Sequence, residues 1–392
     1  MFANLSIIPS LAKFRSLFTK PSFKHAVKYI HGLIAGERKR KNVKSINDMF
    51  LDRKDQSSMN RFLTKYRWDE NELNHRRLRT FLIRKNGGVL IVDDSLIEKS
   101  GKRMEGVGFL FDHSKHKNIL CHNIVFTHYV NGNEQMPMHL EPYLKKEVVK
   151  DLGKKFKTKI EIAIELLKKG LNYINPSVIL FDAWYLAKKL VKSLKKPWIS
   201  RVKTNRLVWQ KDSWMPVKKL VRAIAIEKFR PVDIKISDKK YRWITSLTIK
   251  LKGIDKVKLV VLKKKINSVK AIVLATNLEW SVQSIVKTYK KRFCIDVFYR
   301  DCKQYLGLGE YQLRKIQGIV KHLFPVFLAY SLLKSLKQSL SGFVKSKLRT
   351  IGQLCRVLKQ KILSYFVGWT IGLFHKVGSV DKVINIVIEC LN

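Results

Sequence analysis

Two short apolar segments, each ending in an aspartate, constrain the fold of this chain more than any other feature. Val89–Val92 leads into Asp93 and Asp94, and Val178–Phe181 leads into Asp182. A short run of β-forming residues with a polar end is typical of a buried strand. We therefore expect two buried strands, each of which delivers a carboxylate to the edge of a sheet.

The surrounding pattern predicts an α/β unit built on these strands. Asn131-Gly132 separates two apolar segments, and this dipeptide is a strong hairpin signal. We expect strands at 89–93, 119–130, 134–140, 177–181 and 197–202, and helices at 158–169 and 183–195. This order is similar to that of a ribonuclease-H-like core.

The charge of the chain favours an anionic partner. Lys and Arg number 79 against 30 Asp and Glu, which gives a net charge of +49. Such a field attracts polyanions and favours phosphate contacts. A lysine bias that comes from an AT-rich genome contributes to this excess but does not explain the scarcity of acids. We therefore expect nucleic-acid binding, and the 46% hydrophobic content excludes wholesale disorder.

Other site types are less well supported by the sequence. The five cysteines form no C-x-x-C pair, so we expect no structural zinc site and a reducing cytoplasm. No Gly-rich phosphate loop precedes a helix, and Ser95 has no evident His/Asp partners. The N-terminus shows no signal peptide. Ile362–Phe374 is the longest nearly uncharged apolar run; it is too short for a bilayer span, and a buried helix is expected there.

A third acid lies in a segment with helical periodicity, which is expected to run from 282 to about 305. Tyr289, Arg292, Asp296 and Lys303 are spaced so that they share one side of a helix at ~100° per residue. One acid would then be flanked by a phenol and two cations, which suits phosphate binding. The solvated face of a basic helix is the alternative interpretation.

These residues resemble a known family. The pattern Tyr289-x2-Arg292-x3-Asp296-x6-Lys303 resembles the Tyr-x2-Arg-x3-Glu-x6-Lys signature of DDE transposases from bacterial insertion sequences. The wider segment Tyr289–Arg314 is similar to that family's third-acid region. Val89–Lys99 and Leu180–Tyr185 resemble its first and second acid regions. The resemblance covers roughly residues 85–330.

The resemblance implies a fold class. This is an α/β ribonuclease-H-like catalytic core, a mixed β-sheet with flanking helices, interrupted by a β-rich insertion and flanked by helical N- and C-terminal regions. The implied segments are a helical DNA-binding region (1–85), the first part of the core (86–203), the insertion (204–278), the third-acid helix of the core (279–315) and a helical C-terminal region (316–392).

The resemblance also implies an activity. Asp94, Asp182 and Asp296 would be catalytic metal ligands for two Mg²⁺ ions, which Mn²⁺ could replace. Asp94 is preferred to Asp93 because Ser95 follows it, as Ser or Thr follows the family's first acid. Tyr289, Arg292 and Lys303 would contact DNA. The expected partners are double-stranded DNA, as terminal inverted repeats and target, and a second copy of the chain, with no membrane. The expected location is the bacterial cytoplasm, in association with the nucleoid.

One residue departs from the family pattern. Asp296 stands where the family has Glu, and its side chain is shorter by one methylene, or about 1.5 Å. Metal sites are sensitive to displacements of that size. Two hypotheses follow, an active transposase and a catalytically impaired, transposase-derived DNA-binding protein or repressor. A general nucleic-acid-binding protein without end specificity is a third.

Overall fold

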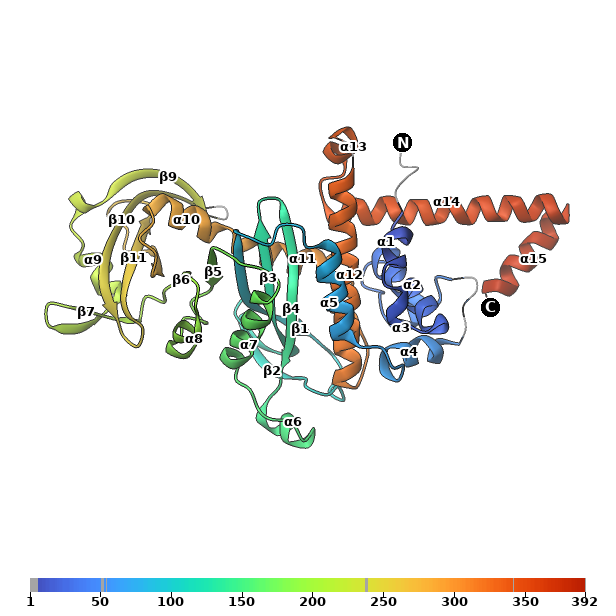
Figure 1. Ribbon diagram of the computed structural model, residues 1–392, viewed down its shortest axis with the longest axis horizontal. Helices are drawn as coiled ribbons and strands as arrows, with labels where there is room; N and C mark the ends of the chain where they lie inside the picture. The colour runs from blue at the N-terminus through green and yellow to red at the C-terminus, as the bar shows by residue number, and fades with distance from the viewer. Residues whose placement is uncertain (1–5, 51–52, 54, 237–238, 341, 392) are drawn as a thin grey trace. The chain divides into compact units, whose positions relative to one another are not determined.

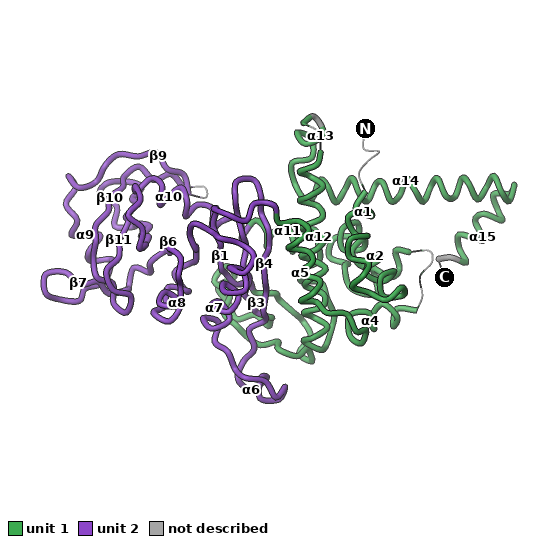
Figure 2. Tube along the Cα trace, in the orientation of Figure 1, with its two compact units in different colours: residues 1–82, 96–122, 297–392 green, residues 83–95, 123–296 purple. Residues whose placement is uncertain are grey.

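A computed structural model describes residues 6–50, 53, 55–236, 239–340 and 342–391. The chain forms two compact units, coloured separately in Figure 2. Unit 1 comprises Met1–Leu82, Leu96–His122 and Val297–Asn392, and unit 2 comprises Ile83–Ser95 and Asn123–Asp296. Each unit therefore combines segments that are distant in the sequence.

Unit 2 is built on a mixed sheet (Figure 1). Its neighbouring strands run in the order β3-β1-β5-β6-β12-β11-β10-β7-β8, while β4 pairs with β3 and β9 pairs with β10. Strands β1, β5 and β6 pair in parallel, and β12 joins β6 antiparallel. The strands are β1 (Val89–Glu98), β3 (Lys117–Asn131), β4 (Glu134–Tyr143), β5 (Val178–Phe181), β6 (Trp198–Arg201), β7 (Leu207–Gln210), β8 (Ser213–Pro216), β9 (Arg230–Ile236), β10 (Lys239–Leu251), β11 (Asp255–Lys263) and β12 (Ala271–Thr276).

This large mixed sheet with flanking helices is consistent with a ribonuclease-H-like fold. The helices of unit 2 are α6 (Lys146–Asp151), α7 (Lys159–Leu171), α8 (Lys188–Ser193), α9 (Val217–Ala223), the 3-10 helix η2 (Ile226–Lys228) and α10 (Val282–Lys290). Helix α7 packs on β4. Thr158 and Glu161 close a reciprocal capping box at the start of α7, which fixes where this helix begins.

The register between β1 and β5 positions the acids. Val92 pairs with Phe181 in the parallel ladder, and the next residue of each segment is an aspartate, Asp93 or Asp182. The four residues before each aspartate are fully buried, so a shift of this register would expose apolar side chains. The ladder therefore holds the two carboxylates at the same edge of adjacent strands.

Several elements confirm the sequence predictions, and others do not. The hairpin at Asn131-Gly132, α7, β5 and β6 are where the sequence indicates. Strand β2 (Gly108–Asp112), which pairs with the first residues of β3 in unit 1, was not predicted. The helix predicted at 183–195 is wrong in length, because α8 begins only at Lys188. The backbone N–H groups of Trp184 and Tyr185 donate to the side chain of Asp182 and so form a turn there.

The single helix predicted from 282 to 305 is also wrong, because two helices occupy this segment. Helix α10 ends at Lys290, and α11 (Phe293–Tyr305) begins three residues later and continues into unit 1. Tyr289 therefore lies on α10, Arg292 lies in the break, and Asp296 lies in the first turn of α11.

Unit 1 is mainly helical. Besides β2, it contains α1 (Ile8–Ala12), the 3-10 helix η1 (Arg15–Leu17), α2 (Lys20–Ala35), α3 (Val43–Asn47), α4 (Gln56–Thr64), α5 (Glu70–Phe81), α12 (Ile316–Ser339), α13 (Gly342–Lys347), α14 (Ile351–Val377) and α15 (Val380–Leu391). Helix α12 packs against α2, α4 and α5. Among the described residues, α12 alone is long and apolar enough to cross a membrane, and 89% of its apolar window is buried within the structure.

The prediction that the apolar run Ile362–Phe374 forms a buried helix is wrong. It forms the second half of α14, but it is not a buried helix: Leu363 is 60% exposed and Trp369 is 42% exposed. The buried residues of α14 are confined to its first turns, from Ile351 to Leu358. The sequence pattern gave the helix correctly, whereas the expectation that this chain covers it was wrong.

Candidate active site

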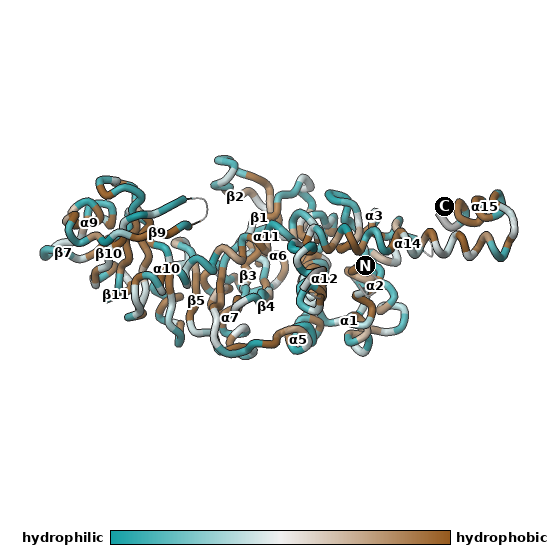
Figure 3. The backbone as a smooth tube through the Cα atoms, turned by 90° about the horizontal axis from the view of Figure 1, so that it is seen from above, coloured by the Kyte–Doolittle hydropathy of each residue, from teal (hydrophilic) through white to brown (hydrophobic). Residues whose placement is uncertain are grey.

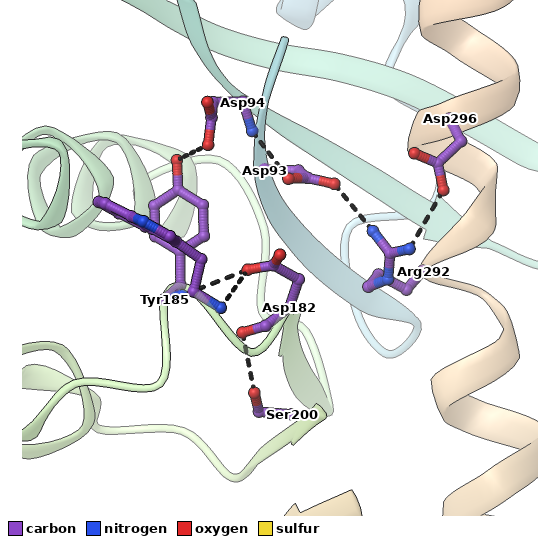
Figure 4. Close-up of polar contacts among 8 residues, drawn as sticks. Asp93, Asp94, Asp182, Tyr185, Ser200, Arg292 and Asp296 are labelled. Atoms are coloured by element: carbon purple, nitrogen blue, oxygen red, sulfur yellow. Dashed lines mark hydrogen bonds and ion pairs between the residues drawn. The ribbon is translucent and has the colours of Figure 1, made fainter. Parts of the chain in front are cut away.

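A cluster of carboxylates gathers at the edge of the unit 2 sheet. Arg292 donates from Nη1 to Oδ2 of Asp93 at 2.8 Å and from Nη2 to Oδ2 of Asp296 at 3.2 Å. Figure 4 shows the guanidinium between these two carboxylates, with Asp182 nearby at the end of β5. The side chains of Asp93 and Arg292 are only 14% and 13% exposed. Acids from two strands and one helix thus converge around one arginine.

The cluster carries more negative charge than Arg292 compensates. Burial raises the pKa of Asp93 to about 8 against the opposing effect of Arg292, and Asp182, Asp94 and Asp296 raise it further. Burial also raises the pKa of Asp296, again opposed by Arg292, and Asp182 adds to the rise. Carboxylates that repel one another in this way gain from a nearby cation.

Asp94 faces the other side of β1. Its Oδ1 accepts a hydrogen bond from the Tyr185 hydroxyl at 2.9 Å. Its Oδ2 accepts from Asn123 Nδ2 at 2.8 Å and from Lys159 Nζ at 3.2 Å. Successive residues of a strand point to opposite faces, which explains why Asp93 and Asp94 have separate environments (Figure 4). The carboxylate of Asp94 is thus occupied by three donors.

Asp182 is held by its own loop and by the neighbouring strand. Its Oδ1 accepts from the backbone N–H groups of Trp184 and Tyr185 at 2.8 and 3.2 Å. The hydroxyl of Ser200, on β6, donates to the Asp182 backbone oxygen at 3.0 Å. These bonds leave Oδ2 of Asp182 directed toward the site (Figure 4).

A cleft of about 430 Å³ adjoins Asp182. Its polar lining is Asp182, Arg201, Lys203, Thr204, Asn205, Tyr289 and Arg292. Burial raises the pKa of Tyr289 to about 12, so its phenol stays protonated and can donate a hydrogen bond. A cleft with three cations beside a carboxylate is suited to a phosphate chain.

Five of the six predicted site residues, Asp94, Asp182, Asp296, Tyr289 and Arg292, lie in unit 2. Lys303 lies in unit 1, where its ammonium donates to the backbone oxygen of Leu96 at 2.8 Å.

The donor set partly suits a divalent cation. Carboxylate oxygens are the ligands that Mg²⁺ prefers, and burial together with the neighbouring acids raises the pKa of Asp93. Among the residues that the structure describes, however, no three His, Cys, Asp or Glu side chains lie close enough to hold one metal ion together. Arg292 accounts for this, because its guanidinium stands between Asp93 and Asp296.

Sequence reasoning missed several residues of the site. Arg201 is the last residue of β6, Lys203 follows it, and both line the cleft, while Lys159 and Tyr185 hold Asp94. A usable signal existed for the first pair, because a strand was predicted at 197–202, the next strand along the chain after that of Asp182. Lys159 carried no signal, because lysines are abundant throughout the chain.

Two family models match the chain. The model described as DDE superfamily endonuclease matches residues 13–220, more than half of the chain, and the model described as Transposase DDE domain matches residues 153–332. The chain belongs to the DDE superfamily endonucleases. These matches support a DDE transposase and a nuclease-type enzyme in general terms, and they are consistent with DNA as the partner.

A curated protein is also similar over part of the chain. Glutamyl-tRNA reductase of Thermosipho melanesiensis is 22% identical over 204 residues, which cover 52% of each protein. The chain thus spans about half the length of that relative. A similarity of this extent does not place the two proteins in one family.

Proposed function

We propose that this chain is the transposase of a bacterial insertion sequence. It cleaves DNA at the terminal inverted repeats and joins the freed 3′ ends to target DNA, with Mg²⁺ or Mn²⁺ as the required ion. The observation that carries the proposal is the β1/β5 register, which brings Asp93 and Asp182 to one sheet edge, where Arg292 links Asp93 to Asp296.

The proposed catalytic acids are Asp93, Asp182 and Asp296. Asp93 replaces Asp94, which the sequence favoured, because Asp93 faces Arg292 whereas Asp94 is occupied on the opposite face by three donors. We assign Asp94 a positioning role, in which it ties β1 to Lys159 of α7 and to Tyr185 in the loop after β5.

The three acids would hold two divalent cations, which lower the pKa of bound water and stabilise the leaving oxygen. Arg292 orients Asp93 and Asp296 through its two Nη atoms. Tyr289, Arg201 and Lys203 line the cleft beside Asp182 and provide a hydrogen-bond donor and two cations for the phosphates of the cleaved strand. Lys303 is a further DNA contact in this proposal.

The remaining parts of the chain have proposed roles as well. The strands of 204–278 form an insertion in a ribonuclease-H-like core, and the helices of 1–85 bind DNA. Two copies of the chain pair the two ends of the element, and the protein works in the cytoplasm at the nucleoid. The net charge of +49 supports contacts with DNA throughout.

A second candidate function rests on Asp296. This acid is one methylene shorter than the family's Glu, and Arg292 already engages it. A chain in which Asp296 fails to reach the ions would bind the ends without cleaving them and would act as a repressor.

One experiment separates the two candidates. A labelled DNA fragment that carries the flanking end sequence is incubated with Mg²⁺ or Mn²⁺ and with wild type, Asp182→Ala or Asp296→Glu. Cleavage by wild type that Asp182→Ala abolishes supports the active transposase. Cleavage by Asp296→Glu alone supports the impaired protein. Binding without cleavage by all three proteins, in either metal, contradicts the catalytic assignment.

A further inference from the structure

Unit 1 contains a cleft of its own, which we call the cationic cleft. It has a volume of about 420 Å³, within the range of small-ligand sites. The end of α2, the residues after it, the end of α11 and one face of α14 surround it. Residues 37–42, which follow α2, are hydrophilic throughout (Figure 3). The charged residues of the lining are Glu37, Arg38, Lys41, Arg356 and Lys359.

Lys41 forms the floor of the cationic cleft. Its side chain is buried, and its ammonium donates to the backbone oxygens of Leu33, Ile34 and Tyr305 at 2.5, 3.4 and 2.5 Å. These oxygens belong to the last turns of α2 and α11, where carbonyl groups lack partners within the helix. The Tyr305 ring lies so close to Gly352 of α14 that an added Cβ would meet it at 2.6 Å. The three helices are thus held together around a preformed cleft, and Lys41 contributes its charge to the floor.

Three further cations of the lining are exposed to solvent: Arg38, Arg356 and Lys359. Arg356 and Lys359 lie three residues apart on one face of α14, and the guanidinium of Arg38 lies 5.3 Å from the centre of the Tyr305 ring. Glu37, the acid of the lining, pairs with Arg40 at 3.6 Å. In the described part of the chain, no carboxylate forms an ion pair with any of these three cations.

The cations of the cleft act on one another. Burial lowers the pKa of Lys41 to about 8, and the charges of Lys359 and Arg38 lower it further, against the opposing effects of Cys355 and Glu310. A concave site lined by charges of one sign concentrates their field and attracts counter-ions. A ligand with several negative charges would relieve this repulsion, whereas a single carboxylate would balance only one of the four cations.

We propose that the cationic cleft binds an oligophosphate, a ligand whose two or three neighbouring phosphates contact Arg38 from the α2 side and Arg356 and Lys359 from α14. Guanidinium groups bind phosphate oxygens through paired hydrogen bonds, and an ammonium adds a point charge. The di- or triphosphate of a nucleotide and successive phosphates of a DNA backbone carry the same groups. The inference rests on residues of unit 1 and is independent of DNA cleavage in unit 2.

The test is isothermal titration calorimetry of the full chain with inorganic pyrophosphate, with ATP and with a short DNA duplex of random sequence. Physiological ionic strength screens exposed charges beyond about 8 Å, which suppresses the effect of net charge alone. Wild type is compared with Arg356→Ser/Lys359→Ser. The matched control is Lys24→Ser/Arg79→Ser, which removes the same charge at exposed positions of α2 and α5. We expect the cleft variant to bind at least about tenfold more weakly than wild type and the control, with unchanged circular dichroism.

The two phosphate sources give different results. Weaker binding of pyrophosphate and ATP by the cleft variant alone assigns the site to a free oligophosphate. A defect confined to the duplex, with a salt dependence lowered by roughly two phosphate contacts, assigns it to the DNA backbone. Equal affinities of the cleft variant and the control for all three ligands would overturn the proposal, because the cations would then act only through net charge. A wild type that binds none of the three would overturn it as well.

Discussion

Two buried polar clusters in this molecule differ in how completely their charges are satisfied. In unit 1, the ammonium of Lys41 donates to the backbone oxygens of Leu33, Ile34 and Tyr305, at the ends of α2 and α11. In unit 2, Asp93 shares one arginine with Asp296 and is repelled by its acidic neighbours. The first cluster is closed, whereas in the second one arginine is shared between two carboxylates.

The difference indicates what each cluster contributes. A closed network of buried hydrogen bonds rigidifies the fold. A cluster of carboxylates with too few cations costs folding free energy, and a charged ligand can recover that cost. Asp94 is intermediate between the two clusters. It belongs to the acidic region, but its carboxylate accepts hydrogen bonds from Asn123, Lys159 and Tyr185. Substitutions in the unit 1 cluster should therefore affect stability alone, whereas substitutions in the acidic cluster should affect activity.

The largest expected effect is the loss of DNA cleavage when one of the two adjacent aspartates, Asp93 or Asp94, is replaced. Asp93→Asn should lower the cleavage rate by on the order of 10³-fold or more, because it removes a proposed metal ligand. Asp94→Asn should lower the rate by only about tenfold, because that side chain acts through its neighbours. Single-turnover cleavage with Mg²⁺ measures both rates. A larger loss in Asp94→Asn than in Asp93→Asn would restore Asp94 as the first acid.

Removal of Arg292 should destabilise the protein, because the carboxylates around it lose a neighbouring cation. Arg292→Ala leaves a mostly buried Asp93 without its cation, so we expect the free energy of unfolding to fall by about 3 kcal/mol. Millimolar Mn²⁺ should recover part of that loss. Denaturant unfolding with and without Mn²⁺ measures both changes. Arg300→Ala, at a side chain that is 60% exposed, is the control and should change little. Equal stability of the two variants would contradict the account.

Lys41→Met should have the opposite profile to Asp93→Asn, with a loss of stability and no loss of cleavage. Methionine fills a similar volume but leaves three carbonyl oxygens without their donor, which should lower the free energy of unfolding by about 2–3 kcal/mol. Cleavage by the folded variant should be unchanged. Chemical denaturation and cleavage assays test these two parts, with the exposed Lys24→Met as the control. A cleavage defect without loss of stability would show that the unit 1 cluster is not purely structural.

His322 should make unit 1 sensitive to acid. Its Nε2 donates to the Gly307 oxygen and its Nδ1 accepts from the Tyr29 hydroxyl, and burial lowers its pKa to about 3. The unfolded chain, with a pKa near 6.5, binds more protons between these values. The stability from this group is therefore complete above about pH 6.5 and is lost toward pH 3, by up to about 1.4 kcal/mol per pH unit.

His322→Gln keeps a donor and an acceptor but cannot titrate. We expect this variant to be less steeply destabilised between pH 7 and pH 5 than wild type. Unfolding midpoints across this range test the prediction. Identical slopes for the two proteins would mean that other groups control the acid sensitivity.

The sequence predicted the carboxylate-bearing strands because their apolar runs have a single plausible role. It did not settle which of Asp93 and Asp94 faces the other acids. Val89–Val92 is buried on both faces of the sheet, so the run shows no alternation from which the orientation of the next residue could be inferred. Only the pairing with β5 and the position of Arg292 distinguish the two aspartates.

Two other errors have physical causes that lie beyond local pattern. Helical periodicity continues from 282 to 305, so the sequence gives no sign of the break between α10 and α11. In the fold, Arg292 lies in this break and contacts Asp93, a residue that is distant in the sequence. The apolar residues of Ile362–Phe374 predict a helix that must be covered. Composition cannot tell whether the rest of the same chain covers it.

The most direct test of the central claim is a Mn²⁺ titration in the presence of end DNA, followed by electron paramagnetic resonance. We predict that wild type and Asp94→Asn bind the ion with similar affinity, and that Asp93→Asn and Asp182→Ala lose at least one site. Equal binding by wild type and Asp93→Asn would contradict the assignment of Asp93 and Asp182 as the acids that hold the metal.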